Sequence, residues 1–469
     1  MTTSCTFSAE YGRWWVLATY SLVAALQGGV WSLPGTLEPA LINVYGISND
    51  TVQLLLNYGA IFYMLVALPT MWALDRFGIR RVTFIGTLLM FSSNVLRLFA
   101  RDGNIPSLVA LHLSYILCAI AGPIAMAVPC KLAEDFFLPS QRTTATAIAA
   151  LANQSGSGFV YLLVPFLSPG INRSDLLHMD ISLTAVSGIA VVMFLIYFPA
   201  HPLVPPSRSA LEAKKSEETV TLSTLATAVL TLSRNIPFVM LTVAYSLTIG
   251  LLNCTGAMLT GNIAPMGGSS SDSGWMGSTA NMSSLAVGVM IASVADYLKA
   301  RAPAGTIRGV LVGLFILAGA AFAVFALCID TTAIMVTFQG RDRLYTAAAA
   351  YVVANVAIAA WIPLAFDMAG EYTFPAPEGT MLMIITLSMN AVSFIFLLMP
   401  SSSFFSWANY GVVGMCLLSA AALSFTLPSN LPRWEFDAIA KEGDGDDVAD
   451  SLLHDEDHEK LINWGSLNT

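Results

Sequence analysis

The sequence predicts an all-α membrane protein with twelve transmembrane helices in two six-helix halves. The first observation behind this prediction is composition: 56% of the 469 residues are hydrophobic and only 11% are charged. A soluble domain carries roughly 25% charged residues. The second is that apolar runs close to the ~20 residues that a bilayer-spanning helix needs recur along the chain. We therefore expect the protein to be embedded in a lipid bilayer, and we expect no nucleic-acid partner.

The twelve apolar runs fix the expected topology. They lie near 13–36, 52–75, 81–100, 106–130, 145–168, 180–200, 236–262, 274–297, 307–329, 344–369, 379–400 and 404–427. An even number of spans puts both termini on one side of the membrane. The side opposite the termini receives few basic residues, namely Arg97, Arg101, Arg173, Arg341 and Arg343. Because cytoplasmic loops carry the excess of Lys and Arg, we place both termini in the cytoplasm.

A polar stretch at 201–235 divides the spans into an N-terminal half, 1–200, and a C-terminal half, 236–427. It contains three prolines and the charged run EAKKSEE, a composition typical of a flexible cytoplasmic linker. The end of the eighth span, with Asp296, is a degraded repeat of the end of the second. The tail 428–469 is acidic and poor in apolar residues, which predicts disorder.

A short charged segment, WALDRFGIRR at 72–81, separates the second and third spans. Asp75, Arg76, Arg80 and Arg81 lie there around Gly78. Charge is unfavourable inside a bilayer, so this cluster indicates an aqueous face. Gly78 suits a tight reversal because it has no Cβ to clash at positive φ. The segment is either a simple basic loop or a conformational hinge, in which Asp75 caps the inner end of the second span.

Six polar or aromatic residues inside the spans are candidates for binding a substrate. They are Gln27 and Trp31 in the first span, Asn153 and Gln154 in the fifth, Asn253 in the seventh and Asn390 in the eleventh. An amide in hydrocarbon needs a partner, which is either a neighbouring helix or a substrate. Gln154 lies roughly 15 Å into a helix that crosses about 30 Å of hydrocarbon, so we expect it at the midplane.

Four titratable side chains are candidates for proton coupling. Asp367 and Glu371 lie at i and i+4 on the inner part of the tenth span and share one helical face. Like charges so placed favour sharing a proton, which suits a proton relay; alternatively, both face cytoplasmic water or pair with basic residues. Glu38 lies near the outer end of the first span. His112, in the fourth, either titrates in an acidic lumen or is structural.

The pattern Asp-Arg-Phe-Gly-x-Arg-Arg between the second and third spans resembles the signature of the major facilitator superfamily. The runs LQGGVW, AGPIAMAVP, TATAIAALANQSG, DSGWMG and IPLAFDMAGEYTFPAPEGT together resemble solute carrier family 49, which includes the feline leukaemia virus subgroup C receptors and the disrupted in renal carcinoma protein. LQGGVW and AGPIAM are most similar to the latter branch. The resemblance implies the major facilitator fold, with substrate held near the midplane between the halves and with Asp75 engaging the opposite half.

For function, the resemblance implies a secondary transporter of a vitamin B6-type vitamer such as pyridoxine, working by alternating access with possible coupling to protons. Choline, ethanolamine or heme transport is the alternative, taken from the receptor branch. In that branch a glutamine similar to Gln154 meets choline, and a tryptophan follows the first-span glutamine; here Gly28 stands at that position. A non-transporting receptor or scaffold is a third reading. No HExxH or GxSxG motif indicates an enzyme.

Short motifs bear on location and partners. Asn172 and Asn49 begin glycosylation sequons on loops predicted to be non-cytoplasmic. Asp457, Leu461 and Ile462 fit an acidic dileucine sorting signal, which adaptor proteins would read. We therefore expect a lysosomal, vacuolar or plasma-membrane protein. The scattered cysteines indicate neither a disulfide framework nor a metal site, and we expect a monomer without cofactors.

Overall fold

The computed structural model describes residues 2–167, 172–202, 222–257, 259–299, 305–330, 341–374, 376, 378–397 and 401–426. This described part of the chain is helical and contains no strand. The predicted sorting residues Asp457, Leu461 and Ile462, the acidic tail and most of the predicted linker lie outside it.

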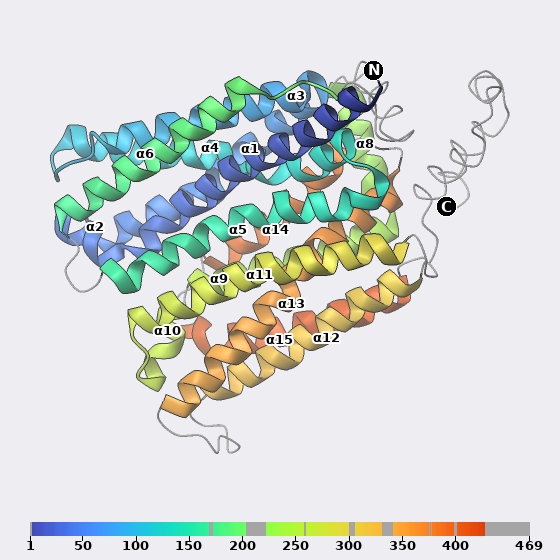
Figure 1. Ribbon diagram of the computed structural model, residues 1–469. Coiled ribbons are helices and arrows are strands. Elements are labelled where there is room, and N and C mark those ends of the chain that lie inside the picture. Colours follow the sequence, from blue (N-terminus) through green and yellow to red (C-terminus); the bar gives the residue numbers. More distant parts are fainter. Residues whose placement is uncertain are drawn as a thin grey trace, which may run out of the picture.

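The helices run side by side in two groups that follow the two halves of the sequence (Figure 1). The N-terminal group contains α1 (Thr2–Thr36), α2 (Glu38–Tyr45), α3 (Asn49–Arg97), α4 (Ile105–Phe136), α5 (Arg142–Leu167) and α6 (Arg173–Ile196). The C-terminal group contains α8 (Leu222–Arg234), α9 (Ile236–Ala257), α10 (Leu259–Ile263), α11 (Ser270–Lys299), α12 (Gly305–Ile329), α13 (Arg341–Thr373), α14 (Glu378–Leu397) and α15 (Ser401–Thr426). Helices α5 and α11 meet where the two groups adjoin.

A helix lies within each of the twelve predicted spans. Among the described residues, nine helices are long and apolar enough to cross a membrane, and one of them, α3, contains both the second and third predicted spans. Asn409–Phe425 is a shorter apolar helix. The multi-pass architecture is therefore confirmed, while twelve separate crossings stay a prediction.

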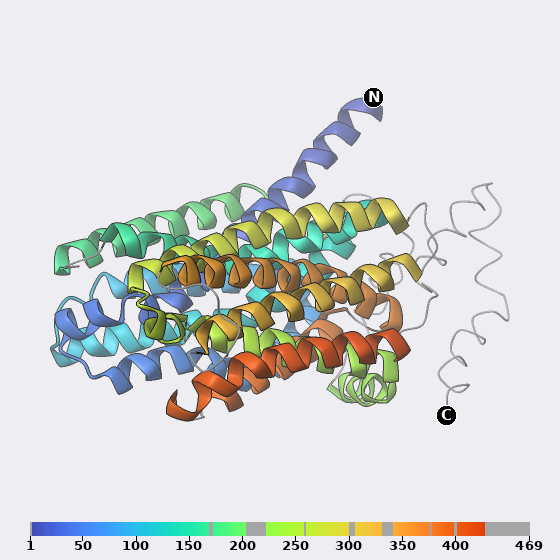
Figure 2. The ribbon, with the colours of Figure 1, turned by 90° about the horizontal axis from the view of Figure 1, so that it is seen from below.

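The chain reverses within α3 at Gly78, where φ is 77° and ψ is 169°. This confirms the expectation that the charged segment turns at the glycine, because a side chain would be strained at that φ. We call the end of the bundle that carries this turn the hinge end. Helix α8 lies at the same end (Figure 1), and the first turns of α1 lean away from the side of the bundle near it (Figure 2).

The structure differs from the predicted flexible linker at its C-terminal part, where α8 forms. Its apolar residues follow the i, i+3, i+7 spacing of an amphipathic helix, at Leu222, Leu225, Val229 and Leu232. Leu232 is buried and Val229 packs against the core of the N-terminal half. Asn235 then ties the start of α9 to α13, because its Nδ2 donates to the Tyr372 carbonyl oxygen at 2.8 Å. The prediction gave weight to the prolines and charges and missed this spacing.

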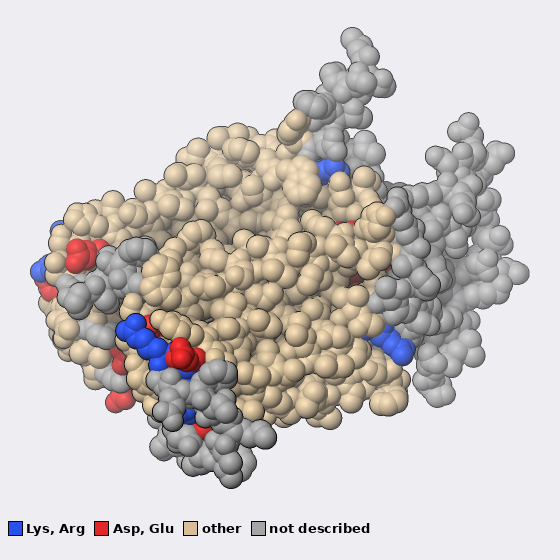
Figure 3. Space-filling view, turned by 60° about the horizontal axis from the view of Figure 1, so that its bottom comes forward, with Lys and Arg blue, Asp and Glu red and all other residues tan. Residues whose placement is uncertain are grey.

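On the face of the bundle that Figure 3 shows, the described surface is apolar around the middle and carries charged side chains towards the two ends. Side chains such as Leu65, Ile85, Leu195 and Met290 are more than half exposed. In water such a surface would be unfavourable, whereas in lipid it is the expected one. The charged ends match the aqueous faces of a membrane.

Arg97 is not the loop charge that the sequence analysis assumed. It is buried at the end of α3 and forms an ion pair with Asp180 of α6, which is equally buried. Its guanidinium carbon also lies 5.7 Å from the centre of the Tyr115 ring. Nearby in α2, burial raises the pKa of the Tyr45 phenol to about 12, so it remains a neutral donor to the Ala100 carbonyl oxygen at 2.9 Å. A polar core therefore joins α2, α3, α4 and α6 at the end opposite the hinge.

Candidate functional site

At the hinge end, Asp75 of the N-terminal half contacts the first turn of α14 in the other half. Its buried carboxylate accepts a hydrogen bond from the Thr380 hydroxyl at 2.7 Å, and a Cβ on Gly379 would lie only 2.4 Å from Oδ1. Lys131 Nζ of α4 lies 3.9 Å from the same oxygen. A carboxylate is stabilised there because the N-terminus of a helix is the positive end of its dipole.

Asp296, at the end of α11, makes the matching contact in the opposite direction. Its carboxylate accepts hydrogen bonds from the backbone N–H of Thr143 at 3.2 Å, and from the N–H and hydroxyl of Thr144 at 2.8 and 2.7 Å. These residues form the first turn of α5. The degraded repeat in the sequence thus corresponds to a spatial repeat, in which each half supplies one aspartate to a helix N-terminus of the other.

A third contact between the halves lies deeper in the bundle. The Tyr63 hydroxyl of α3 donates to Thr386 Oγ1 of α14 at 2.6 Å, and both side chains are buried. Sequence reasoning missed this pair, because a tyrosine and a threonine in apolar runs look like ordinary span residues. Their only sequence signal is a hydroxyl on each partner within a predicted span.

The structure brings Gln27 and Asn153 together. Asn153 Nδ2 donates to Gln27 Oε1 at 2.7 Å and to the Ala24 carbonyl oxygen at 2.9 Å. Gln27 Nε2 lies 3.4 Å from the carbonyl oxygen of Cys118 on α4. Both amides therefore have the interhelical partners that were the alternative to substrate binding, and together they link α1, α4 and α5.

Glycines allow α1 and α5 to approach at this level. A Cβ on Gly28 would lie 2.0 Å from the Asn153 carbonyl oxygen, and one on Gly156 would lie 1.8 Å from that of Ala25. No side chain fits at either position without moving the backbone. The Ser157 hydroxyl adds a 2.9 Å hydrogen bond to the Gly28 carbonyl oxygen.

Gln154 differs from its neighbour Asn153. Its side chain is partly buried and makes no hydrogen bond with any other residue that the structure describes. It shares a helical face with Leu151 and Gly158, three residues before and four after it. Both of these pack on α11: Leu151 against Gly288, and Gly158 against Asn281. The free amide is thus directed towards the opposite half.

The remaining substrate-binding candidates, Trp31, Asn390 and Asn253, each contact another helix. The Trp31 indole packs beside Gly59 of α3, where a Cβ would lie 2.1 Å from Nε1. Asn390 Nδ2 donates to the Thr386 carbonyl oxygen of its own helix at 2.8 Å and lies 3.9 Å from the sulfur of Met126 on α4. Asn253 Nδ2 lies 4.0 Å from the sulfur of Met389. These contacts place Asn390 at the boundary between the halves and Asn253 within the C-terminal half.

The proton-coupling candidates fall into two separate groups. Asp367 and Glu371 are buried near the hinge end of α13 and are not free of partners. Glu38 is partly buried in the first turn of α2, near the opposite end of the bundle. His112 is in the same outer region, with Nδ1 3.0 Å from the Tyr58 hydroxyl. Only Asp367 and Glu371 are therefore placed to act together.

The other predicted sites lie at a turn or at the start of a helix. Arg76, Arg80 and Arg81 are exposed around the Gly78 turn. Asn172 is exposed and caps α6, with its Oδ1 accepting from the Ser174 backbone N–H at 2.8 Å. Asn49 begins α3. Within the described ranges, no group of His, Cys, Asp or Glu could hold a metal ion.

Comparison with known proteins identifies the family. The model of the Major Facilitator Superfamily matches residues 20–373, about three quarters of the chain. The chain belongs to this superfamily. Two solved structures of the xylose transporter XylE agree with this. The proton:xylose symporter XylE bound to 6-bromo-6-deoxy-D-glucose has a TM-score of 0.67 at 14% identity, covering 91% of this chain and 99% of that one. The partially occluded inward-open form of XylE from E. coli has a TM-score of 0.61, also at 14% identity. At this identity the likeness shows the fold alone.

This major facilitator is also similar in sequence to members of solute carrier family 49, the family that its motifs resemble. The solute carrier family 49 member 4 homolog of Xenopus tropicalis is 29% identical over 433 residues, covering 87% of this chain and 89% of the relative. The choline/ethanolamine transporter FLVCR2 of Rattus norvegicus is 23% identical, with coverage of 92% and 77%. These relatives and structural neighbours are transporters and carriers, not enzymes.

Proposed function

We propose that this major facilitator is a secondary transporter that moves a small organic solute by alternating access, with a vitamin B6-type vitamer such as pyridoxine as its substrate. The observation that carries the proposal is Gln154. This amide has no hydrogen-bond partner among the described residues, and it faces the opposite half at mid-span. A polar group left unpaired in a membrane interior is unfavourable unless a ligand pairs with it.

A neutral amide suits such a substrate. The hydroxyls and pyridine nitrogen of a vitamer need fixed donors and acceptors, which an amide supplies without burying a charge. In this proposal Gln154 contacts the substrate, and Trp31 offers a ring face for stacking. Asn253 and Asn390 border the site, and the Gln27–Asn153 pair braces α1 against α5 behind it, because each of these amides already has a protein contact.

Choline or ethanolamine is the second candidate, since several relatives carry these substrates in their names. A quaternary ammonium is held by surrounding aromatic faces. The receptor branch places one such aromatic directly after the first-span glutamine. Here that position is Gly28, which lies against the Asn153 carbonyl and has no room for a side chain. This packing favours a vitamer over a quaternary ammonium; heme has no comparable supporting contact.

The transport cycle that we propose uses the aspartate contacts as its inner gate. With both termini in the cytoplasm, Asp75 and Asp296 hold the cytoplasmic ends of the halves together, and their release opens the site inward. Asp367 and Glu371 are the residues that we propose for proton coupling, because they share one buried helical face near that gate. A lysosomal, vacuolar or plasma membrane is the proposed location.

Replacing Gln154 by alanine tests the substrate assignment. We expect apparent affinity to fall by about 1–3 kcal/mol, because a hydrogen-bonding group of the substrate is left unpaired. Uptake of labelled pyridoxine, choline and ethanolamine into proteoliposomes identifies the substrate. Repeating the assay with and without a pH gradient shows whether transport is coupled to protons.

Asn153→Ala is the matched control, because the neighbouring amide is bonded to Gln27 and Ala24. It should lower thermal stability rather than affinity. The Gln154 assignment fails if Gln154→Ala lowers stability and leaves affinity unchanged. Transport of none of the three solutes would instead favour the receptor reading.

A further inference from the structure

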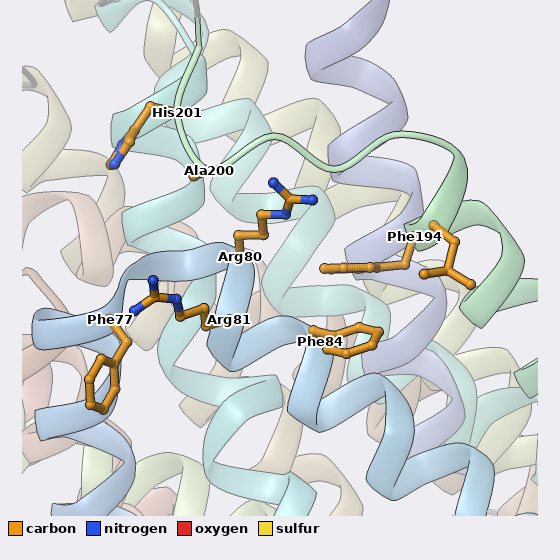
Figure 4. A pocket seen from close by; sticks show the side chains of 8 residues that line it. Phe77, Arg80, Arg81, Phe84, Phe194, Ala200 and His201 are labelled. Atoms are coloured by element: carbon orange, nitrogen blue, oxygen red, sulfur yellow. The ribbon is translucent and has the colours of Figure 1, made fainter.

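A surface cavity at the hinge end is not used by the proposed transport site. Its volume is about 470 Å³, and it lies between the Gly78 turn of α3 and the end of α6 (Figure 4). Its lining includes Phe77, Arg80, Arg81, Phe84, Phe194 and His201. Basic and aromatic side chains therefore share one hollow at the place where the apolar belt meets the charged end.

The charge in this cavity is unbalanced. Arg80 and Arg81 are both exposed, and neither forms an ion pair with a carboxylate that the structure describes. The Arg81 guanidinium carbon lies 5.9 Å from the centre of the Phe77 ring. Figure 4 shows Arg81 turned towards Phe77 and Arg80 extended towards the Phe194 side of the cavity. Two guanidinium groups thus face the hollow, with no carboxylate partner in the part of the chain that the structure describes.

The inner wall of the cavity is apolar and continues into the lipid-facing surface. Phe84 stacks on Phe194 with ring centres 5.1 Å apart. Beside them, Ile85 of α3 and Leu195 of α6 are 52% and 67% exposed. A ligand with an anionic head and hydrocarbon chains would match both parts of this surface.

We propose that the cavity binds the phosphate headgroup of an anionic phospholipid from the cytoplasmic leaflet. The guanidinium groups of Arg80 and Arg81 contact the phosphate oxygens, which they fit in a bidentate manner, and the acyl chains lie along the exposed apolar faces of α3 and α6. The cytoplasmic leaflet is the anionic one. The proposal uses the orientation given above but does not depend on the transported substrate.

Native mass spectrometry of the detergent-purified full chain tests this. The protein is titrated with phosphatidylserine and, separately, with phosphatidylcholine of the same acyl chains. We expect phosphatidylserine to bind in preference. An arginine near an anionic lipid surface contributes about five-fold in affinity, so Arg80→Gln should weaken binding about five-fold and the Arg80→Gln/Arg81→Gln double variant should remove the preference.

Arg234→Gln is the matched control, because Arg234 is an exposed arginine on α8 outside the cavity; it should keep the preference. Thermal unfolding of each variant shows whether it is folded. Arg80→Lys changes the side chain but keeps its charge, so it separates the effect of losing the charge from that of disturbing the fold. Equal binding of the two lipids by the wild type, or an unchanged preference in the double variant, overturns the proposal. Displacement of the lipid by an equal concentration of soluble glycerol phosphate also overturns the proposal, because the acyl chains would then contribute nothing to the affinity.

Discussion

Asp75→Asn should make Cys130 about ten-fold more reactive towards N-ethylmaleimide. Cys130 is a buried native thiol on α4, packed within the core cluster of the C-terminal half. Separation of the halves at the hinge end would expose it. The asparagine keeps the size of the side chain and its ability to bond Thr380. It removes the charge that faces the N-terminus of α14 and Lys131.

The size of this effect follows from the charge alone. A carboxylate at a partly buried helix N-terminus contributes up to about 2 kcal/mol, and 1.4 kcal/mol is a ten-fold change in an equilibrium. Peptide mass spectrometry of the alkylated protein gives the rate at Cys130 separately from the other thiols. Asp296→Asn should act in the same direction, because it releases the matching contact on α5.

Asp342→Asn serves as the control for this experiment. It is the same chemical change at an exposed aspartate in the first turn of α13, at the other end of that helix from Asp367 and Glu371. Its Cys130 reactivity should equal that of the wild type. Wild-type reactivity in both Asp75→Asn and Asp296→Asn would show that these aspartates do not hold the halves together.

Asp180→Ala should destabilise the protein by about 3–5 kcal/mol, because it leaves Arg97 buried without its anion. The side chains of the pair are each 5% exposed. We expect a large fall in the midpoint temperature of thermal unfolding. Tryptophan fluorescence of the protein in detergent measures this midpoint. The double variant Arg97→Met/Asp180→Leu should recover much of the loss, because apolar side chains replace both charges.

The chain offers a matched pair for comparison. Asp102 and Arg173 form an ion pair between the same two types of residue, but their side chains are 44% and 58% exposed. An exposed ion pair contributes about 0–1 kcal/mol, so Asp102→Ala should barely change the midpoint. Equal effects of Asp180→Ala and Asp102→Ala would mean that the buried pair is not what stabilises this end of the bundle.

Composition and local pattern determined the class of this protein and much of its architecture. Apolar runs of membrane-spanning length predicted helices where the structure has them, because a bilayer forces the backbone to satisfy its own hydrogen bonds. Gly78 marked the reversal in α3 for an equally local reason, its freedom at positive φ. The motif around it resembles that of the superfamily, and the weak repeat matched Asp296 to Asp75, although only the structure shows that Asp296 contacts the other half.

Which polar side chains are free was decided only by the tertiary structure. Asn153 and Gln154 are adjacent in sequence and chemically alike, and sequence reasoning treated both as candidates. The fold turns Asn153 towards Gln27, 126 residues away, and turns Gln154 towards α11. Arg97 likewise looked like a loop charge until Asp180 was found beside it. An amide or a charge is satisfied by whichever helix packs against it, and that neighbour is set by the packing of the whole bundle rather than by the residues nearby in the chain.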